Sequence, residues 1–213
     1  MNIVNFEQSQ VTPSKIICIG RNYVDHIAEL GNEIPDEMVV FVKPNSAITE
    51  QLQSHHHEPL HYEAELCFLY QHTTTQKAQG KPGTFVGVAI GLDLTKRTLQ
   101  AKLKAKGLPW ERAKSFDGAA LFSDFVQLDS INDSLHLALS IDGNIAQAGG
   151  VKLMMYKPEQ ILAELQTFMT LTDGDIVMTG TPKGVGQIRA GSEFVAKVLQ
   201  QDKVLISKTW LAN

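Results

Sequence analysis

The chain has 213 residues, of which 43% are hydrophobic and 20% are charged, and its formal net charge at pH 7 is -4. This ordinary globular balance, with no block of like charge, argues against a nucleic-acid-binding surface. No apolar run approaches the roughly 20 residues that span a bilayer. Residues 1–10 lack the basic and apolar parts of a signal peptide. We therefore expect a cytoplasmic protein that does not contact membranes.

Strands dominate the predicted secondary structure. They are expected at residues 15–19, 39–42, 61–70, 84–93, 135–141, 144–146, 175–178, 194–199 and 204–208. Helices are expected at 95–106, with Thr95 as the N-cap, and at 158–169, with Pro158 in the first turn. Because strands outnumber substantial helices and no linker is visible, we predict one domain over residues 1–213, with 1–14 as a short N-terminal extension.

Two carboxylates, Glu63 and Glu65, stand at the beginning of an apolar run. Alternate residues of a strand point to the same face, so the two lie side by side and each disfavours ionisation of the other. Water at an exposed strand end offsets this repulsion, and so does a hard divalent cation. Asp93, at the tip of the run 84–93, also needs a partner for its carboxylate. The glutamates alone leave both interpretations open.

A second group of candidates lies on turns and loops. His26 and Glu29 are three residues apart, so on one helical turn they share a face. This arrangement suits either a general base, with the glutamate orienting the imidazole, or a plain surface pair. Lys114 is either a solvated charge or a fixed cation for an anionic substrate.

Three other sequence features argue against a histidine metal site, a phosphate-binding loop and a disulfide. The consecutive histidines at 55–57 cannot share one strand face and lack the helical spacing of a metal site, so we predict a polar loop. The glycine-rich stretch 179–186 lacks the ending of a phosphate loop, although its N–H groups can hold a carboxylate. Cys18 and Cys67 lie in strand-like runs and are expected to be buried free thiols.

Five motifs in chain order resemble the fumarylacetoacetate hydrolase family, in its short single-domain branch. They are Gly20-Arg21-Asn22-Tyr23 with His26 and Glu29; Glu63-Ala64-Glu65; Gly91-Leu92-Asp93-Leu94-Thr95 with Arg97 and Gln100; Ala113-Lys114-Ser115-Phe116-Asp117; and Thr179-Gly180-Thr181-Pro182-Lys183-Gly184-Val185-Gly186. The resemblance covers nearly the whole chain. It implies an α+β, predominantly β fold, in which mixed β-sheets roll into a sandwich-like barrel with a few peripheral helices, usually as a homodimer.

The resemblance also implies roles for the candidate residues. It implies a Mg²⁺ or Mn²⁺ site at Glu63, Glu65 and Asp93. It assigns Lys114 to the developing enolate, and His26 with Glu29 to a catalytic dyad on a mobile segment that orders over bound ligand. The implied substrate-facing positions are Arg21, Arg97, Gln100 and Thr181. Thr98 stands where many relatives carry an acid, which leaves the partner of Arg97 open.

The chemistry of these residue types fits a small 2-oxo acid substrate. Three carboxylates leave about half of an octahedral magnesium shell open, and the cation stabilises charge on the 2-oxygen of the substrate. The leading hypothesis is a Mg²⁺-dependent hydrolase that cleaves the C–C bond of acylpyruvates (2,4-dioxo acids), with oxaloacetate decarboxylase or tautomerase activity in the same site. The alternatives are an isomerase or decarboxylase of the 2-hydroxyhepta-2,4-diene-1,7-dioate type, a non-catalytic small-ligand-binding protein on this fold, and a nucleotide-binding module built on residues 179–186.

Overall fold

The structure is a computed structural model that describes residues 1–29, 35–72 and 83–213, without the side chains of residues 26–28. Its largest sheet has the strand order β4-β3-β12-β6-β7-β8, with β9 paired on β7. The strands are β3 (Lys15–Gly20), β4 (Val39–Pro44), β6 (Ala64–Gln71), β7 (Thr84–Asp93), β8 (Ala120–Phe122), β9 (Val126–Gln127) and β12 (Ile176–Met178). β12 runs parallel to β3 and antiparallel to β6, so the sheet is mixed.

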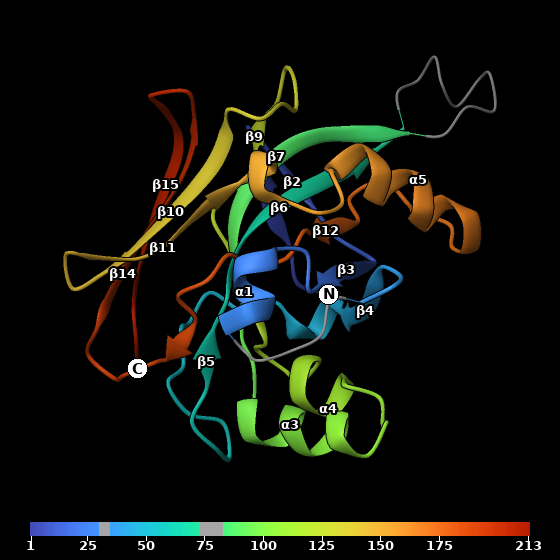
Figure 1. Ribbon diagram of the computed structural model, residues 1–213. Helices are drawn as coiled ribbons and strands as arrows, with labels where there is room; N and C mark the ends of the chain where they lie inside the picture. The colour runs from blue at the N-terminus through green and yellow to red at the C-terminus, as the bar shows by residue number, and fades with distance from the viewer. Residues whose placement is uncertain (30–34, 73–82) are drawn as a thin grey trace.

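A second sheet packs against one face of the first (Figure 1). It is fully antiparallel and consists of β11 (Asn144–Gly150), β10 (Leu135–Ile141), β14 (Glu193–Gln200) and β15 (Lys203–Leu211), in that spatial order. Every second residue of β10 between Leu135 and Leu139 is buried, as the alternating sequence predicted. The core between the sheets includes Leu66 and Phe68 from β6 and Leu137 and Val198 from the second sheet.

The other face of the large sheet is also covered. The hairpin of β1 (Val4–Phe6) and β2 (Ser9–Val11) contributes the buried side chain of Val4 to a second apolar cluster. Thus the first residues of the chain, expected to be an extension, pack onto the fold. Cys18 and Cys67 lie in this cluster as free, buried thiols, as predicted, and burial raises the pKa of both. Burial on both faces explains why the central strands have nearly continuous apolar sequences.

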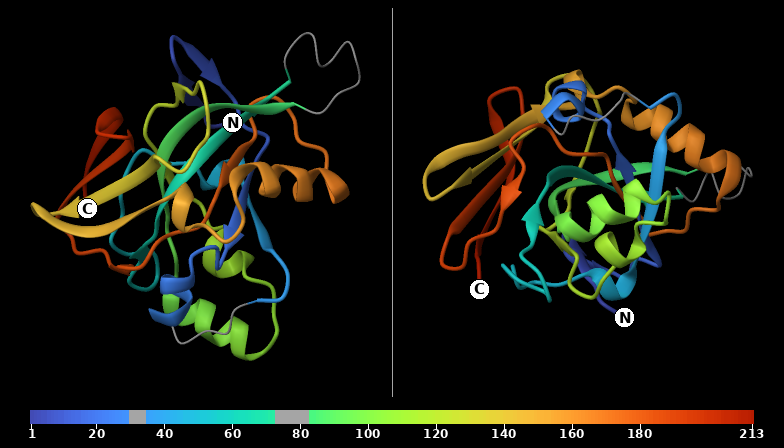
Figure 2. Two further views of the ribbon diagram at one scale, coloured as in Figure 1. Left: turned by 45° about the horizontal axis from the view of Figure 1, so that its top comes forward. Right: turned by 60° about the horizontal axis from the view of Figure 1, so that its bottom comes forward.

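The helices lie around the curled sheets. They are α1 (Val24–Glu29), α3 (Arg97–Ala105), α4 (Glu111–Lys114) and α5 (Pro158–Phe168), with the single 3-10 turns η1 (Asn45–Ala47) and η2 (Val151–Leu153). A short pair of strands, β5 (His61–Tyr62) and β13 (Gly186–Gln187), lies beside them. In the right view of Figure 2, α3 and α4 cover one end of the curled large sheet. This arrangement confirms the predicted α+β fold. No helix in the described ranges is long and apolar enough to cross a membrane.

Asp175 connects three segments at the start of β12. Its buried carboxylate accepts hydrogen bonds from Ser14 Oγ at 2.6 Å and from the Thr172 N–H at 2.8 Å, and it pairs with Lys15 Nζ at 2.5 Å. Burial alone raises the pKa of this carboxyl, but the donors outweigh burial and hold the pKa below its usual value. The carboxylate therefore stabilises the fold in its charged form.

We expect Asp175→Ala to lower the free energy of unfolding by about 3 kcal/mol, because its buried and half-buried donors lose their partner. Asp175→Asn, which keeps the shape, is expected to lose less. Since the folded pKa is depressed, the stabilisation is present above the unfolded pKa of about 3.9 and is lost as the pH falls through the folded pKa. Urea unfolding at neutral and acidic pH measures this, and a deficit of Asp175→Ala that did not shrink in acid would contradict it.

Candidate active site

Three carboxylates converge where β6 begins and β7 ends. Glu65 lies opposite Gly91 in the antiparallel register, and the Asp93 N–H donates to the Glu63 carbonyl at 2.9 Å. The side chains of Glu63, Glu65 and Asp93 therefore share one face, and each offers an oxygen within 4.8 Å of the others. All three are buried. Ala64 points the other way, into the core between the two sheets. We call this group the acid triad.

Lys114, the last residue of α4, places its ammonium group against the acid triad. Its Nζ donates to Glu63 Oε2 at 2.8 Å, to Asp93 Oδ2 at 2.7 Å and to Thr95 Oγ1 at 2.7 Å. Burial lowers the pKa of this ammonium, but the charges of Asp93 and Glu63 outweigh burial and leave the pKa raised. Lys114 is therefore a fixed cation, and a substrate oxygen can accept from it only in exchange for one of these three acceptors.

The prediction that Thr95 caps α3 was wrong. The residue that precedes the helix is Lys96, whose side chain makes no cap, and the first-turn N–H groups of Thr98 and Leu99 donate instead to Glu58 Oε1 at 3.1 and 3.3 Å. The Thr95 hydroxyl instead accepts a hydrogen bond from Lys114, and the Thr95 backbone pairs with that of His61. A threonine before a helical pattern is a local signal, whereas the lysine that takes its hydroxyl is 19 residues away along the chain.

A second buried lysine, Lys43 of β4, belongs to the site but was not among the predicted residues. Its Nζ lies 2.7 Å from Asp93 Oδ1 and donates a hydrogen bond to the Lys114 carbonyl. The contact with Asp93 is an ion pair rather than a well-directed hydrogen bond, because Asp93 Oδ1 has no hydrogen-bond partner. In the sequence Lys43 follows the apolar run 39–42 and gives no sign of burial, whereas in the structure its fully buried ammonium needs the counter-charge of Asp93.

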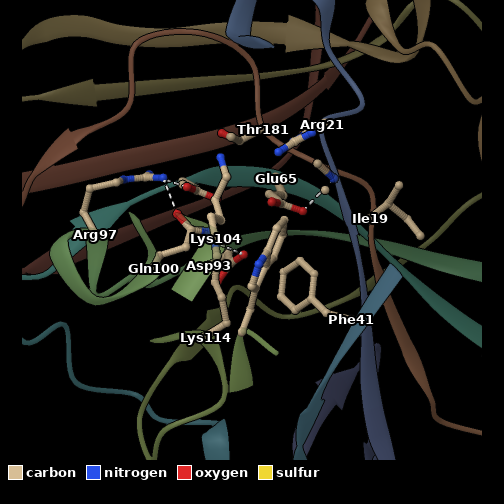
Figure 3. Close-up of a pocket in the computed structure, with 14 residues that line it drawn as sticks. Ile19, Arg21, Phe41, Glu65, Asp93, Arg97, Gln100, Lys104, Lys114 and Thr181 are labelled. Carbon is tan, nitrogen blue, oxygen red and sulfur yellow. Dashed lines mark hydrogen bonds and ion pairs between the residues drawn. The ribbon is translucent and has the colours of Figure 1, made fainter. Parts of the chain in front are cut away.

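Helix α3 presents one polar face to the same pocket. Arg97 makes an ion pair with Glu63 Oε1 and donates from Nη1 to Gln100 Oε1 at 2.8 Å. The acid that pairs with Arg97, left open by the sequence, is therefore Glu63. Lys104 also lines the pocket and was not predicted. Positions 97, 100 and 104 follow the i, i+3, i+7 spacing of one helix face, and this signal could have found Lys104. Figure 3 shows these side chains around the acid triad.

The remaining walls come from distant parts of the chain. Arg21 lies in the turn after β3, and Figure 3 places it across the acid triad from Arg97. Phe41 of β4 and Trp110 contribute aromatic surface, with ring centroids 5.8 Å apart. The pocket therefore has acidic, basic and apolar walls, a combination that fits a small polar anion.

The glycine-rich loop does hold carboxylates, and they belong to the protein itself. The Gly180 N–H donates to Glu65 Oε2 at 2.7 Å, and the Gly184 N–H donates to both oxygens of Glu29 at 3.0 and 3.1 Å. Gly180 has a φ of 92°, a left-handed conformation that favours glycine. Thr181 lines the pocket, but its hydroxyl donates to the Ala64 carbonyl at 2.9 Å.

The predicted dyad lies on α1, near this loop. Glu29, at the end of α1, is held by the Gly184 N–H. The side chain of His26 lies outside the described residues, so its pairing with Glu29 stays a prediction. The Asp25 carboxylate lies 3.3 Å from Lys183 Nζ, a second contact between α1 and the glycine-rich loop.

The site disfavours the charged form of Glu65 when no cation is bound. Burial raises its pKa well above the usual value, and the nearby charges of Asp93 and Glu63 raise it further. Three buried carboxylate oxygens so close together are a ligand set for a hard divalent cation such as Mg²⁺ or Mn²⁺. The residues thus fit such a cation. Across the described ranges, none of the histidines at 55–57 belongs to a group that could hold a metal.

The sequence matches the family described as "Fumarylacetoacetate (FAA) hydrolase C-terminal" over residues 15–207. The chain belongs to the fumarylacetoacetate hydrolase family, as its motifs predicted. The fold agrees with this. It matches the crystal structure of a candidate fumarylacetoacetate isomerase/hydrolase from Oleispira antarctica with a TM-score of 0.90 and 32% identity, over 100% of both chains.

Similar proteins with curated names are enzymes. The chain is 38% identical over 196 residues to mitochondrial oxaloacetate tautomerase FAHD1 from Arabidopsis thaliana, covering 87% of this chain and 86% of that protein. It is 36% identical over 189 residues to oxaloacetate tautomerase YcgM from Escherichia coli, covering 85% and 86%. The crystal structure of a fumarylpyruvate hydrolase from Pseudomonas aeruginosa contains Mn²⁺ and pyruvate. It matches this fold with a TM-score of 0.84 and 24% identity, over 99% of this chain and 95% of that one. At this identity the likeness shows the fold alone.

Proposed function

We propose that this protein is a divalent-cation-dependent oxaloacetate tautomerase, which interconverts the keto and enol forms of its substrate. The observation that carries the proposal is the convergence of Lys114 with the three buried carboxylates of the acid triad. The sequence-based hypothesis put C–C hydrolysis first. The names of the relatives with 36% and 38% identity favour tautomerisation as the main activity and oxaloacetate as the substrate.

We propose that Glu63, Glu65 and Asp93 hold Mg²⁺ or Mn²⁺. When bound, the cation supplies a Lewis acid that polarises the 2-oxo group of the substrate. The chain's own residues fix the geometry of the ligands. Arg97 and Lys114 hold the two oxygens of Glu63, and the Gly180 N–H holds Glu65. A homodimer stays a prediction for this chain.

Tautomerisation moves a proton between C3 and the 2-oxygen of oxaloacetate, so negative charge builds up on that oxygen as C3 loses its proton. The ammonium of Lys114 lies beside the acid triad and stabilises this charge in a largely buried pocket. We assign proton transfer at C3 to His26, oriented by Glu29. The hydrogen bonds from the Gly184 N–H support this assignment, because they hold the Glu29 carboxylate in one place.

C–C hydrolysis of acylpyruvates is the second candidate. It requires the same stabilisation of an enolate, together with a base that aims a water at the distal carbonyl. The position of Glu29 favours this candidate. Its carboxylate is anchored on the loop that also carries the pocket residues Gly180 and Thr181.

A comparison of two substrates tests the proposed function. With Mg²⁺ present, we expect the enzyme to accelerate ketonisation of enol-oxaloacetate, followed by the loss of enol absorbance, with a larger kcat/KM than hydrolysis of acetylpyruvate. Glu63→Gln is the matched loss-of-function variant, and it should remove both activities because it disrupts the acid triad. Faster hydrolysis than ketonisation would support the second candidate, whereas turnover of neither substrate would favour a binding protein.

A further inference from the structure

Gln147 carries a buried amide in the second sheet. It lies on β11, opposite Leu139 of β10, at a position of the strand where the side chain is buried. An amide in such a place is costly unless its polar atoms have hydrogen-bond partners. The partners of Gln147 lie outside its own sheet, on the segment that carries two acids of the triad and on the glycine-rich loop.

The Gln147 amide reaches the backbone of Ala64, the residue between the two glutamates of the acid triad. Its Oε1 accepts a hydrogen bond from the Ala64 N–H at 2.9 Å. Its Nε2 donates to Thr181 Oγ1 at 2.8 Å and to the Pro182 carbonyl at 2.7 Å, so both donors of the amide have partners. The Thr181 hydroxyl in turn donates to the Ala64 carbonyl at 2.9 Å. One connected network therefore holds both backbone groups of Ala64.

The place of Ala64 in the large sheet explains why it needs these partners. The Asp93 N–H donates to the Glu63 carbonyl, so the backbone groups of Glu63 face β7 and those of Ala64 face away from it. On that other side, β12 pairs with β6 from Cys67 to Leu69. Ala64 lies beyond the end of this pairing, so two side chains take over where the backbone ladder ends.

Strand β11 also packs directly against the glycine-rich loop. The two backbones approach so closely that a Cβ on Gly184 would collide with the Ala146 carbonyl oxygen. The loop in turn holds Glu65 through the Gly180 N–H. Because Gln147 follows Ala146 in the chain, backbone packing as well as hydrogen bonds fixes its position on the loop.

We propose that Gln147 is a positioning residue of the metal centre. It holds the Ala64 backbone directly and through Thr181, and in this way it fixes the spacing between the two glutamates of the acid triad. This inference rests on the proposed function, in which the acid triad binds a divalent cation. Two carboxylates that repel each other bind a cation best when the chain already holds them at one separation. Loss of the amide leaves the buried Ala64 N–H without an acceptor, and the backbone between the glutamates then shifts.

Gln147→Met tests the assignment, because methionine keeps the length of the side chain and removes its hydrogen bonds. Val198→Ala is the matched control for a general loss of stability, since Val198 is buried in the same sheet, on the strand two places from β11. The dissociation constant for Mn²⁺ is measured on metal-free protein by electron paramagnetic resonance of the free ion. The midpoint of urea unfolding is measured in chelator.

We expect both variants to lower the urea midpoint, since each removes buried contacts. Gln147→Met should also weaken Mn²⁺ binding by about ten- to a hundredfold, the usual effect of removing a group that orients metal ligands. Val198→Ala should bind Mn²⁺ within about twofold of the wild type, because it lies apart from the network. Equal weakening in both variants, or an unchanged Mn²⁺ affinity in Gln147→Met, would overturn the assignment.

Thr181→Val is a second variant, which keeps the inference testable if Gln147→Met does not fold. It removes the hydroxyl that joins the Gln147 amide to the Ala64 carbonyl. We expect it to weaken Mn²⁺ binding in the same direction. Wild-type Mn²⁺ affinity in Thr181→Val would contradict the claim that this network sets the spacing of the glutamates.

The same measurements separate this inference from the proposed reaction. If Mn²⁺ affinity depends on Gln147 but the wild type does not ketonise oxaloacetate, then the positioning role stands and the proposed reaction fails. If the wild type ketonises oxaloacetate but Gln147→Met binds Mn²⁺ as tightly as the wild type, then the reaction stands and the role of Gln147 fails. A wild type that binds no Mn²⁺ overturns this role together with the metal site.

Discussion

Lys114→Met is expected to lower kcat for oxaloacetate tautomerisation by about 100- to 1,000-fold, the usual effect of removing one preorganised group that stabilises a developing oxyanion. Methionine keeps most of the length of the side chain and removes the charge. Because Lys114 is fully buried between Glu63 and Asp93, water cannot replace its ammonium without rearranging the site. The measurement is kcat and KM for ketonisation at saturating Mg²⁺.

The same substitution leaves two buried carboxylates without the ammonium they share. We therefore expect Lys114→Met to lower the free energy of unfolding by about 3 kcal/mol in chelator, and we expect Mg²⁺ to restore part of this loss. Arg112→Met, at an exposed position of the same short helix, is the matched control and should leave both quantities unchanged. A Lys114→Met enzyme with a near-normal kcat would remove Lys114 from the reaction.

Glu65→Gln is expected to stabilise the metal-free protein while it abolishes cation-dependent turnover. Burial and the charges of Asp93 and Glu63 raise the pKa of Glu65, so ionising this carboxyl opposes folding when no cation is present. Glutamine is neutral, and its Oε1 can still accept the hydrogen bond from the Gly180 N–H. We expect a gain of about 1–3 kcal/mol in unfolding free energy at alkaline pH in chelator.

The sign of the pH dependence follows from the raised pKa. Above the unfolded pKa of about 4.3, the folded wild type keeps a proton on Glu65 that the unfolded chain has released, so its stability falls as pH rises towards the folded pKa. Glu65→Gln lacks this fall, and the stability difference between the two proteins should widen over that range. Urea unfolding in chelator at several pH values measures it, with the exposed Glu111→Gln as control. A variant less stable than the wild type at every pH would contradict the account.

Regular patterns allowed much of the fold to be predicted. The run 84–93 and the alternation over 135–141 gave β7 and β10 with their observed bounds, and Pro158 marked the beginning of α5. The triad was predictable for the same reason, because strand parity puts Glu63 and Glu65 on one face and a buried strand ends at Asp93.

The rest of the site depends on contacts between distant residues. Lys43 lies at a strand end in the sequence, and only its ion pair with Asp93 reveals its role. Lys104 was not singled out, although it shares a helix face with Arg97 and Gln100, because the sequence does not show which face of α3 turns towards the pocket. Likewise, no local pattern indicated that the N–H groups of Gly180 and Gly184 would hold Glu65 and Glu29.

The most direct test of the account is a titration of the metal-free protein with Mn²⁺, in which the free ion is followed by electron paramagnetic resonance. One saturable site per chain is expected in the wild type and in Glu111→Gln, and loss of that site is expected in Glu65→Gln. No binding to the wild type, or equal binding to the wild type and Glu65→Gln, would contradict the claim that the acid triad holds a divalent cation.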